Sequence, residues 1–227
     1  MINKRKTRPV VAVDLDGVVL DFKASWQECA SWTCHKKIAK VSDDYDLALR
    51  FGMSALEHQN TWRAFHADWW DRVEPYPETF EWIHTLERAG TTIIGITNVD
   101  ARHQISRARS LCGIIPEGRI FCLGHNASST IRANILRKLN AKAYIDDLPT
   151  NANAAYPVVP VTVLLNRNYA NIEQPQAGIT IVDDAHDFLE VASAVLSLYS
   201  ETTNQRHEGA PERKTHQGSF GSPVHTA

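Results

Sequence analysis

The sequence contains no long apolar segment and almost no excess charge of either sign. Its apolar runs fall well short of the roughly 18 residues that a membrane-spanning helix needs. The N-terminal MINKRKTRP leads into the first strand-like segment without the apolar stretch of a signal peptide. The formal net charge is −2, whereas a general nucleic-acid binder requires a dense face of lysine and arginine. These absences predict a soluble, cytoplasmic protein that binds neither membranes nor nucleic acids in general.

Cysteine is scarce, and its spacing is poor for a zinc site. No two of the four cysteines form a C-x-x-C pair, the spacing that many zinc-binding motifs use. We therefore expect reduced thiols, mostly buried, that behave as small apolar groups. The four residues are Cys29, Cys34, Cys112 and Cys122.

Apolar residues make up 43% of the 227 positions, enough for a substantial core, and they recur in short strand-like segments. These segments are PVVAVDL, TTIIGITN, GRIFCLG, AKAYIDD, VVPVTVLLN and GITIV. Helix-like segments follow most of them, and in the last, DDAHDFLEVASAVLSLY, Asp183 and Asp184 look like the N-cap and first turn. Such alternation predicts an α/β three-layer sandwich with a Rossmann-like parallel sheet covered on both faces.

The region between the first two strands is too long for a simple crossover. It contains five of the six tryptophans and has a helical pattern throughout. We predict a small helical cap at 22–74 and a core domain formed by 1–21 and 75–200. The aromatic side chains of the cap pack as a core or form a wall for base stacking, and the pattern leaves both interpretations open. Residues 201–227 are polar and nearly free of aliphatic side chains, which predicts a disordered tail.

Polar residues stand where the predicted strands end, and in parallel α/β sheets ligands bind at the carboxyl ends of the strands. Asp14 and Asp16 follow the first strand, and Thr97 and Asn98 follow the second. The carboxylate of Asp14 can attack phosphorus and form an aspartyl-phosphate. Asp16, two residues later, can act as general acid and then as general base. The Thr97 hydroxyl and the Asn98 amide are suited to donate to phosphate oxygens.

A third group of polar residues indicates a divalent cation. Asp146 and Asp147 end the fourth strand-like segment, and together with Asp14 they offer the hard oxygen ligands that Mg²⁺ prefers. A cation at this point would offset the repulsion between the Asp14 carboxylate and a phosphate dianion. We therefore expect Mg²⁺ as the cofactor, although a turn before Pro149 is an alternative reason for the acidic pair.

Four elements in order, D-x-D-G-V, T-N, a basic residue and D-D, resemble the motifs of the haloacid dehalogenase-like (HAD) hydrolase superfamily. DLDGVVLDF and VEPYPETFEWIHTLERAG look like segments of its 5'(3')-deoxyribonucleotidase-like branch, and the likeness covers roughly 10–171. The resemblance implies a basic residue that bridges nucleophile and phosphate. We predict Arg132 for this role, with Lys138 and Lys142 as alternatives. The resemblance also implies that the backbone carbonyl of Asp16 is a further metal ligand.

The strand-tip residues and this resemblance together predict a Mg²⁺-dependent phosphomonoesterase that acts on a small phosphorylated metabolite. Likeness to the deoxyribonucleotidase-like branch makes a nucleoside monophosphate the expected substrate, with a phosphosugar or a nucleic-acid 3′-phosphate as the alternative. A receiver-like signalling domain also uses acidic residues and Mg²⁺, but it would carry its acidic pair after the first strand. The sequence leaves open whether the chain forms a homodimer.

Overall fold

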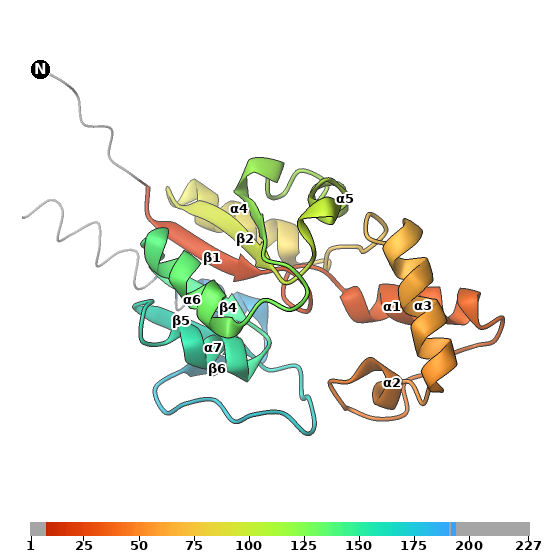
Figure 1. The fold of residues 1–227 in the computed structure, drawn as a ribbon. Coiled ribbons are helices and arrows are strands. Elements are labelled where there is room, and N and C mark those ends of the chain that lie inside the picture. Colours follow the sequence, from red (N-terminus) through yellow and green to blue (C-terminus); the bar gives the residue numbers. More distant parts are fainter. Residues whose placement is uncertain (1–7, 191, 194–227) are drawn as a thin grey trace, which may run out of the picture.

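Six parallel strands form the centre of the structure, a computed structural model that describes residues 8–190 and 192–193 (Figure 1). The sheet order is β3-β2-β1-β4-β5-β6. The strands are β1 (Val10–Asp14), β2 (Thr92–Thr97), β3 (Ile120–Cys122), β4 (Ala143–Asp146), β5 (Val161–Leu165) and β6 (Thr180–Val182). Each coincides with one of the six strand-like segments, so the predicted fold class is confirmed. The predicted disordered tail lies outside the described residues.

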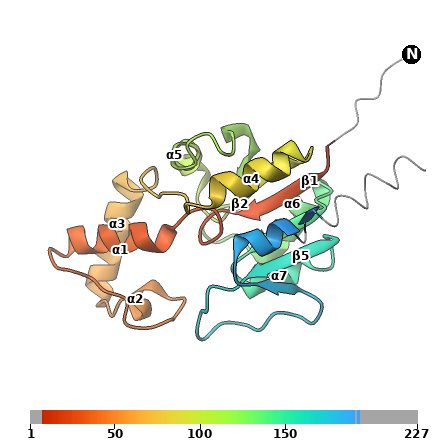
Figure 2. The same ribbon diagram turned by 180° about the vertical axis from the view of Figure 1, so that it is seen from behind.

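Helices cover both faces of this sheet (Figures 1 and 2). On one face lie α6 (Ser129–Lys138) and α7 (Pro149–Ala155), and on the other lie α4 (Thr79–Arg88) and the helical residues 185–190. The helix α5 (Gln104–Ser110) packs near β3, and two short 3-10 helices, Ala101–His103 and Glu117–Arg119, flank it in sequence. None of the described helices is long and apolar enough to cross a membrane.

Successive residues of β1 point to opposite faces of the sheet, as the period of two in a strand requires. Val11 and Val13 belong to the core cluster that includes Trp82 of α4, whereas Ala12 packs in the cluster that includes Leu136 of α6. All three β1 residues are fully buried. A strand that is apolar on both faces therefore stands in the middle of the sheet, and its carboxyl end carries Asp14.

Three helices between β1 and α4 form a unit set apart from the sheet (Figure 1). They are α1 (Phe22–Thr33), α2 (Leu47–Arg50) and α3 (Ala55–Asp68), and α1 packs against α3. The contact between them is aromatic: Trp26 and Phe65 are fully buried, with ring centroids 5.5 Å apart. Trp26 is thus a packing residue. We call these three helices and their connections, residues 22–74, the cap.

Candidate active site

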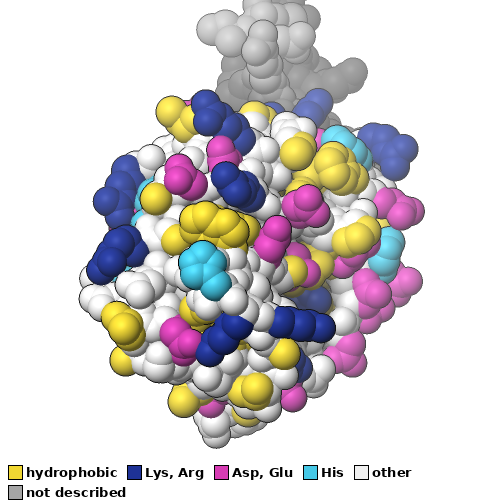
Figure 3. All heavy atoms as spheres, turned by 90° about the vertical axis from the view of Figure 1, so that its right-hand side faces the viewer, with side chains coloured by type: hydrophobic (Ala, Val, Ile, Leu, Met, Phe, Trp, Pro, Cys, Tyr) yellow, Lys and Arg dark blue, Asp and Glu magenta, His cyan; other side chains and the backbone are white. Residues whose placement is uncertain are grey.

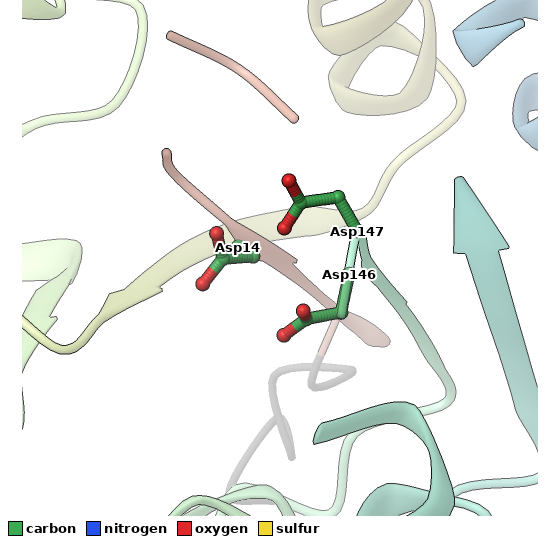
Figure 4. A group of neighbouring side chains, drawn as sticks. All are labelled: Asp14, Asp146 and Asp147. Carbon is green, nitrogen blue, oxygen red and sulfur yellow. The ribbon is translucent and has the colours of Figure 1, made fainter. Parts of the chain in front are cut away.

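Three carboxylates meet at the carboxyl ends of β1 and β4, which are neighbouring strands (Figure 4). Asp14, Asp146 and Asp147 are buried and each offers an oxygen within 4.8 Å of the other two. Burial raises the pKa of Asp14 well above its ordinary value, and the Asp146 carboxylate raises it further. Burial also raises the pKa of Asp147 to about 7, although Lys23 opposes this shift. Buried oxygen ligands whose negative charges repel one another fit a divalent cation such as Mg²⁺.

Gly17 allows the chain to turn closely beneath this cluster. Its φ is +91°, a conformation that a residue with a side chain rarely adopts. A Cβ added at this position would overlap the Asp147 carboxylate. The carbonyl of Gly17 accepts a hydrogen bond from Arg167 Nε at 2.7 Å, which fixes the turn to the loop after β5.

Arg132 reaches the acidic cluster from α6 and is 2% exposed. Its Nη1 donates to Asp14 Oδ1 at 2.6 Å and to Asp146 Oδ2 at 3.2 Å, while Nη2 donates to Asn98 Oδ1 at 2.9 Å. The guanidinium therefore joins the tips of β1, β2 and β4. The two alternatives lie elsewhere: Lys138 is exposed, and Lys142 donates to Asn140 at 2.8 Å.

Three further groups, from β4 and the start of α7, hold Asp146. Tyr144 lies two residues earlier on β4, and its hydroxyl donates to Asp146 Oδ2. Asp146 Oδ1 accepts from the Leu148 amide at 2.8 Å and from Asn151 Nδ2 at 3.2 Å. The spacing of two residues on one strand was a usable signal for Tyr144, because it places both side chains on the same face.

Asp16 stands beside the cluster, with its side chain 23% exposed. Thr97 Oγ1, at the end of β2, donates to Asp16 Oδ2 at 3.1 Å. Arg107 Nη2, from α5, donates to Asp16 Oδ1. Arg107 is fully buried and was missed at the level of sequence, where nothing distinguishes it from the other arginines near it.

A cavity of about 370 Å³ opens between these residues and the cap. The strand tips supply its polar floor, through Asp14, Asp16, Thr97, Asn98, Arg132 and Asp147. The cap supplies a wall that is largely aromatic, through Phe22, Lys23, Tyr45, His58, Trp62 and Trp70. Phe22 stacks on Trp62 with ring centroids 6.2 Å apart, so part of the cap's aromatic set lines the cavity instead of filling the cap's interior.

Lys23, in the first turn of α1, is a cation in this wall. Its Nζ lies 3.8 Å from Asp147 Oδ2 and 3.9 Å from the centre of the Tyr169 ring. Burial lowers the pKa of Lys23 to about 8, although the Asp147 carboxylate opposes this shift. The Tyr169 hydroxyl also donates to Asp147 Oδ2. One face of Asp147 is therefore turned toward the cap.

Comparison with known proteins gives structural matches only. No family model matches the sequence, and no curated protein matches it. A predicted phosphoglycolate phosphatase from Haemophilus somnus is 16% identical, with a TM-score of 0.57 over 82% of this chain and 98% of that one. A HAD-family hydrolase from Deinococcus radiodurans, with bound phosphate and sodium, is 16% identical, with a TM-score of 0.57 over 84% and 97%. A protein described as a β-phosphoglucomutase, from Thermotoga maritima, is 15% identical, with a TM-score of 0.51 over 82% and 99%.

These likenesses establish the fold, which is that of HAD-like hydrolase structures. Dehalogenases of the same fold also match, for example one at 15% identity with a TM-score of 0.53 over 82% of this chain and 97% of the other. None of the proteins named here is a nucleotidase. The comparisons therefore do not support the deoxyribonucleotidase-like branch that the sequence motifs suggested.

Proposed function

We propose that this protein is a phosphoric monoester hydrolase that transfers a phosphoryl group to Asp14 and then to water. The observation that carries the proposal is the convergence of the Asp14 carboxylate with two further buried carboxylates and the Arg132 guanidinium at adjacent strand tips. A buried carboxylate is a nucleophile that can form a covalent intermediate. A guanidinium binds phosphate oxygens in a fixed geometry.

Asp14, Asp146 and Asp147 would hold Mg²⁺, together with the backbone carbonyl of Asp16 that the family resemblance implies. When bound, this ion supplies positive charge against the phosphate dianion. Side chains of the protein bind the phosphate oxygens. Arg132 lies against Asp14 and can donate to an equatorial phosphate oxygen, and the Thr97 hydroxyl can turn from Asp16 to a second oxygen.

Asp16 distinguishes phosphate-ester hydrolysis from dehalogenation, which matters because dehalogenases share the fold. An alkoxide leaving group needs a proton, whereas a halide does not. Asp16 lies beside Thr97 at the floor of the cavity, within reach of a leaving oxygen. It can protonate that oxygen and then take a proton from the attacking water. A second acid in this place favours the phosphatase.

A small phosphorylated metabolite such as a phosphosugar or phosphorylated acid is the substrate class that the comparisons favour. Two of the matching structures are described as a phosphoglycolate phosphatase and a β-phosphoglucomutase. A nucleoside monophosphate is the second candidate, supported by the aromatic side chains of Phe22, Trp62 and Trp70 in the cavity wall. On the cap side of the molecule acidic and basic side chains are interspersed (Figure 3). A nucleic-acid 3′-phosphate is therefore disfavoured on this face.

Release of phosphate from a panel of sugar phosphates, phosphorylated acids and nucleoside monophosphates tests the proposal. We expect turnover with Mg²⁺, loss of turnover with chelator, and a fall of about 10³-fold or more in Asp14→Asn, which keeps the shape of the side chain. Turnover of nucleotides alone would select the second candidate. Equal turnover by Asp14→Asn would remove Asp14 as nucleophile. Uptake of phosphoryl from a donor without turnover would instead indicate a signalling domain.

A further inference from the structure

Arg107, on α5, is a fully buried cation. Its Nη2 donates to Asp16 Oδ1, and its Nη1 donates to the carbonyl of Trp70 at 3.4 Å. Its Nε has no hydrogen-bond partner. Burying a charged group costs free energy unless it is paired, and a hydrophobic residue could fill the same volume more cheaply. The cost of burying this charge therefore indicates that the contact of Arg107 with Asp16 serves the site.

We propose that Arg107 is a positioning residue that fixes the acid/base Asp16 and leaves one of its two oxygens to carry the transferred proton. This inference rests on the proposed function. A guanidinium can only donate hydrogen bonds, so the oxygen it engages, Asp16 Oδ1, accepts from it. The other oxygen, Oδ2, faces Thr97 at 3.1 Å. When Thr97 donates to a phosphate oxygen instead, Oδ2 is free to hold a proton beside the leaving group.

The same guanidinium ties Asp16 to the wall of the cavity. Trp70 follows α3 at the end of the cap, and its carbonyl accepts hydrogen bonds from both Arg107 and the Ser110 hydroxyl, the latter at 2.6 Å. The Arg107 guanidinium carbon lies 5.3 Å from the centre of the Trp70 ring, which lines the cavity. One side chain thus joins Asp16 to the aromatic wall of the cavity.

The chemical step shows where Arg107 acts. An oxygen of Asp14 bonds to phosphorus while the bond from phosphorus to the ester oxygen breaks, and the bonding electron pair goes to that oxygen. The proton on Asp16 Oδ2 moves to the same oxygen, which leaves Asp16 as a carboxylate next to Arg107. The guanidinium therefore stabilises the negative charge that appears on Asp16. An alkyl ester depends on this proton, whereas p-nitrophenolate leaves without one.

Comparison of kcat/KM for glycerol 2-phosphate and p-nitrophenyl phosphate tests the inference, because kcat/KM reports the steps up to formation of the phosphoenzyme. In Arg107→Met we expect kcat/KM for the alkyl ester to fall at least about tenfold more than that for the aryl ester. We expect Arg107→Lys to recover part of this difference. If Arg107→Met does not fold, Arg107→Gln takes its place with the same expected result.

Ser110→Ala is the matched control, because Ser110 shares the Trp70 carbonyl with Arg107 and does not contact Asp16 in the described hydrogen bonds. We expect it to leave the alkyl-to-aryl ratio unchanged. An equal fall for both esters in Arg107→Met, or the same change of ratio in Ser110→Ala, would overturn the inference while the phosphatase proposal stands. A wild-type enzyme inert toward every ester overturns both.

Discussion

Gly17 links the backbone conformation after β1 to the position of the acidic cluster. It follows Asp16, has a φ of +91°, and passes so close to Asp147 that no side chain fits. We expect Gly17→Ala to lower the free energy of unfolding by about 1–3 kcal/mol through backbone strain, and to lower activity further because Asp147 must move. Chemical denaturation and phosphate release measure the two effects.

Gly90 provides the control for this substitution. Its φ is +89°, almost the same as that of Gly17, but a Cβ there would meet nothing within 4 Å. Gly90→Ala therefore carries the backbone strain without the contact to Asp147. If both variants lost the same stability and kept full activity, close approach of Gly17 to the cluster would have no functional consequence.

At the scale of single residues, the sequence identified the acids better than the groups that hold them. Asp14, Asp146 and Asp147 end apolar strands, so their convergence followed from the geometry of a parallel sheet. Arg107 contacts Asp16 across 91 positions of sequence. No local pattern encodes such a distant contact, because α5 is brought to the strand tips by packing of the whole core.

The beginning of α3 shows how a short sequence pattern determines an element of the cap. Ser54 accepts from the amide of Glu57, and the Glu57 carboxylate accepts from the Ser54 amide at 2.9 Å, which is a capping box. We expect Ser54→Ala to lower the free energy of unfolding by about 1 kcal/mol. Thermal or urea unfolding measures this loss.

Ser128 is the matched position for that experiment. It is the N-cap residue of α6, but its side chain makes no capping hydrogen bond. We therefore expect Ser128→Ala to change stability much less than Ser54→Ala. An equal loss in the two variants would show that the residue type at the N-cap, rather than the hydrogen bond seen at Ser54, accounts for the effect.

At the scale of elements, the strands were predictable because each is apolar, short and ended by polar residues. The helices of the cap were recognisable from their pattern, but the partner of each aromatic ring was not. Trp26 is buried between α1 and α3, whereas Trp62, on α3, lines the cavity. A helical period places residues on a face of their own helix, and it does not say what that face meets.

The stability of the whole molecule is linked to protonation of the acidic cluster. Burial raises the pKa of Asp147 to about 7 from an ordinary value of 3.8, and that of Asp14 is raised as well. At a pH between 3.8 and about 7, the Asp147 carboxyl is protonated in the folded protein but ionised in the unfolded chain. The protein's free energy of unfolding therefore falls as the pH rises from about 4 through 7 in the absence of metal. For Asp147 alone, this pKa shift corresponds to a loss in the free energy of unfolding on the order of 4 kcal/mol.

Urea unfolding in chelator across this pH range measures the decline. The proposed function places Mg²⁺ among the ionised carboxylates of the folded state, so we expect saturating Mg²⁺ to reduce the decline by stabilising the folded protein at the higher pH. In chelator, Asp147→Asn should make the free energy of unfolding fall less with rising pH, because one titrating group is removed. Asp43→Asn is the control, because Asp43 is an exposed acid whose pKa is lowered by its hydrogen bond with Lys40. A free energy of unfolding that rises from pH 5 to pH 7 in chelator would contradict the burial of these carboxylates, and with it the reason for placing a cation among them.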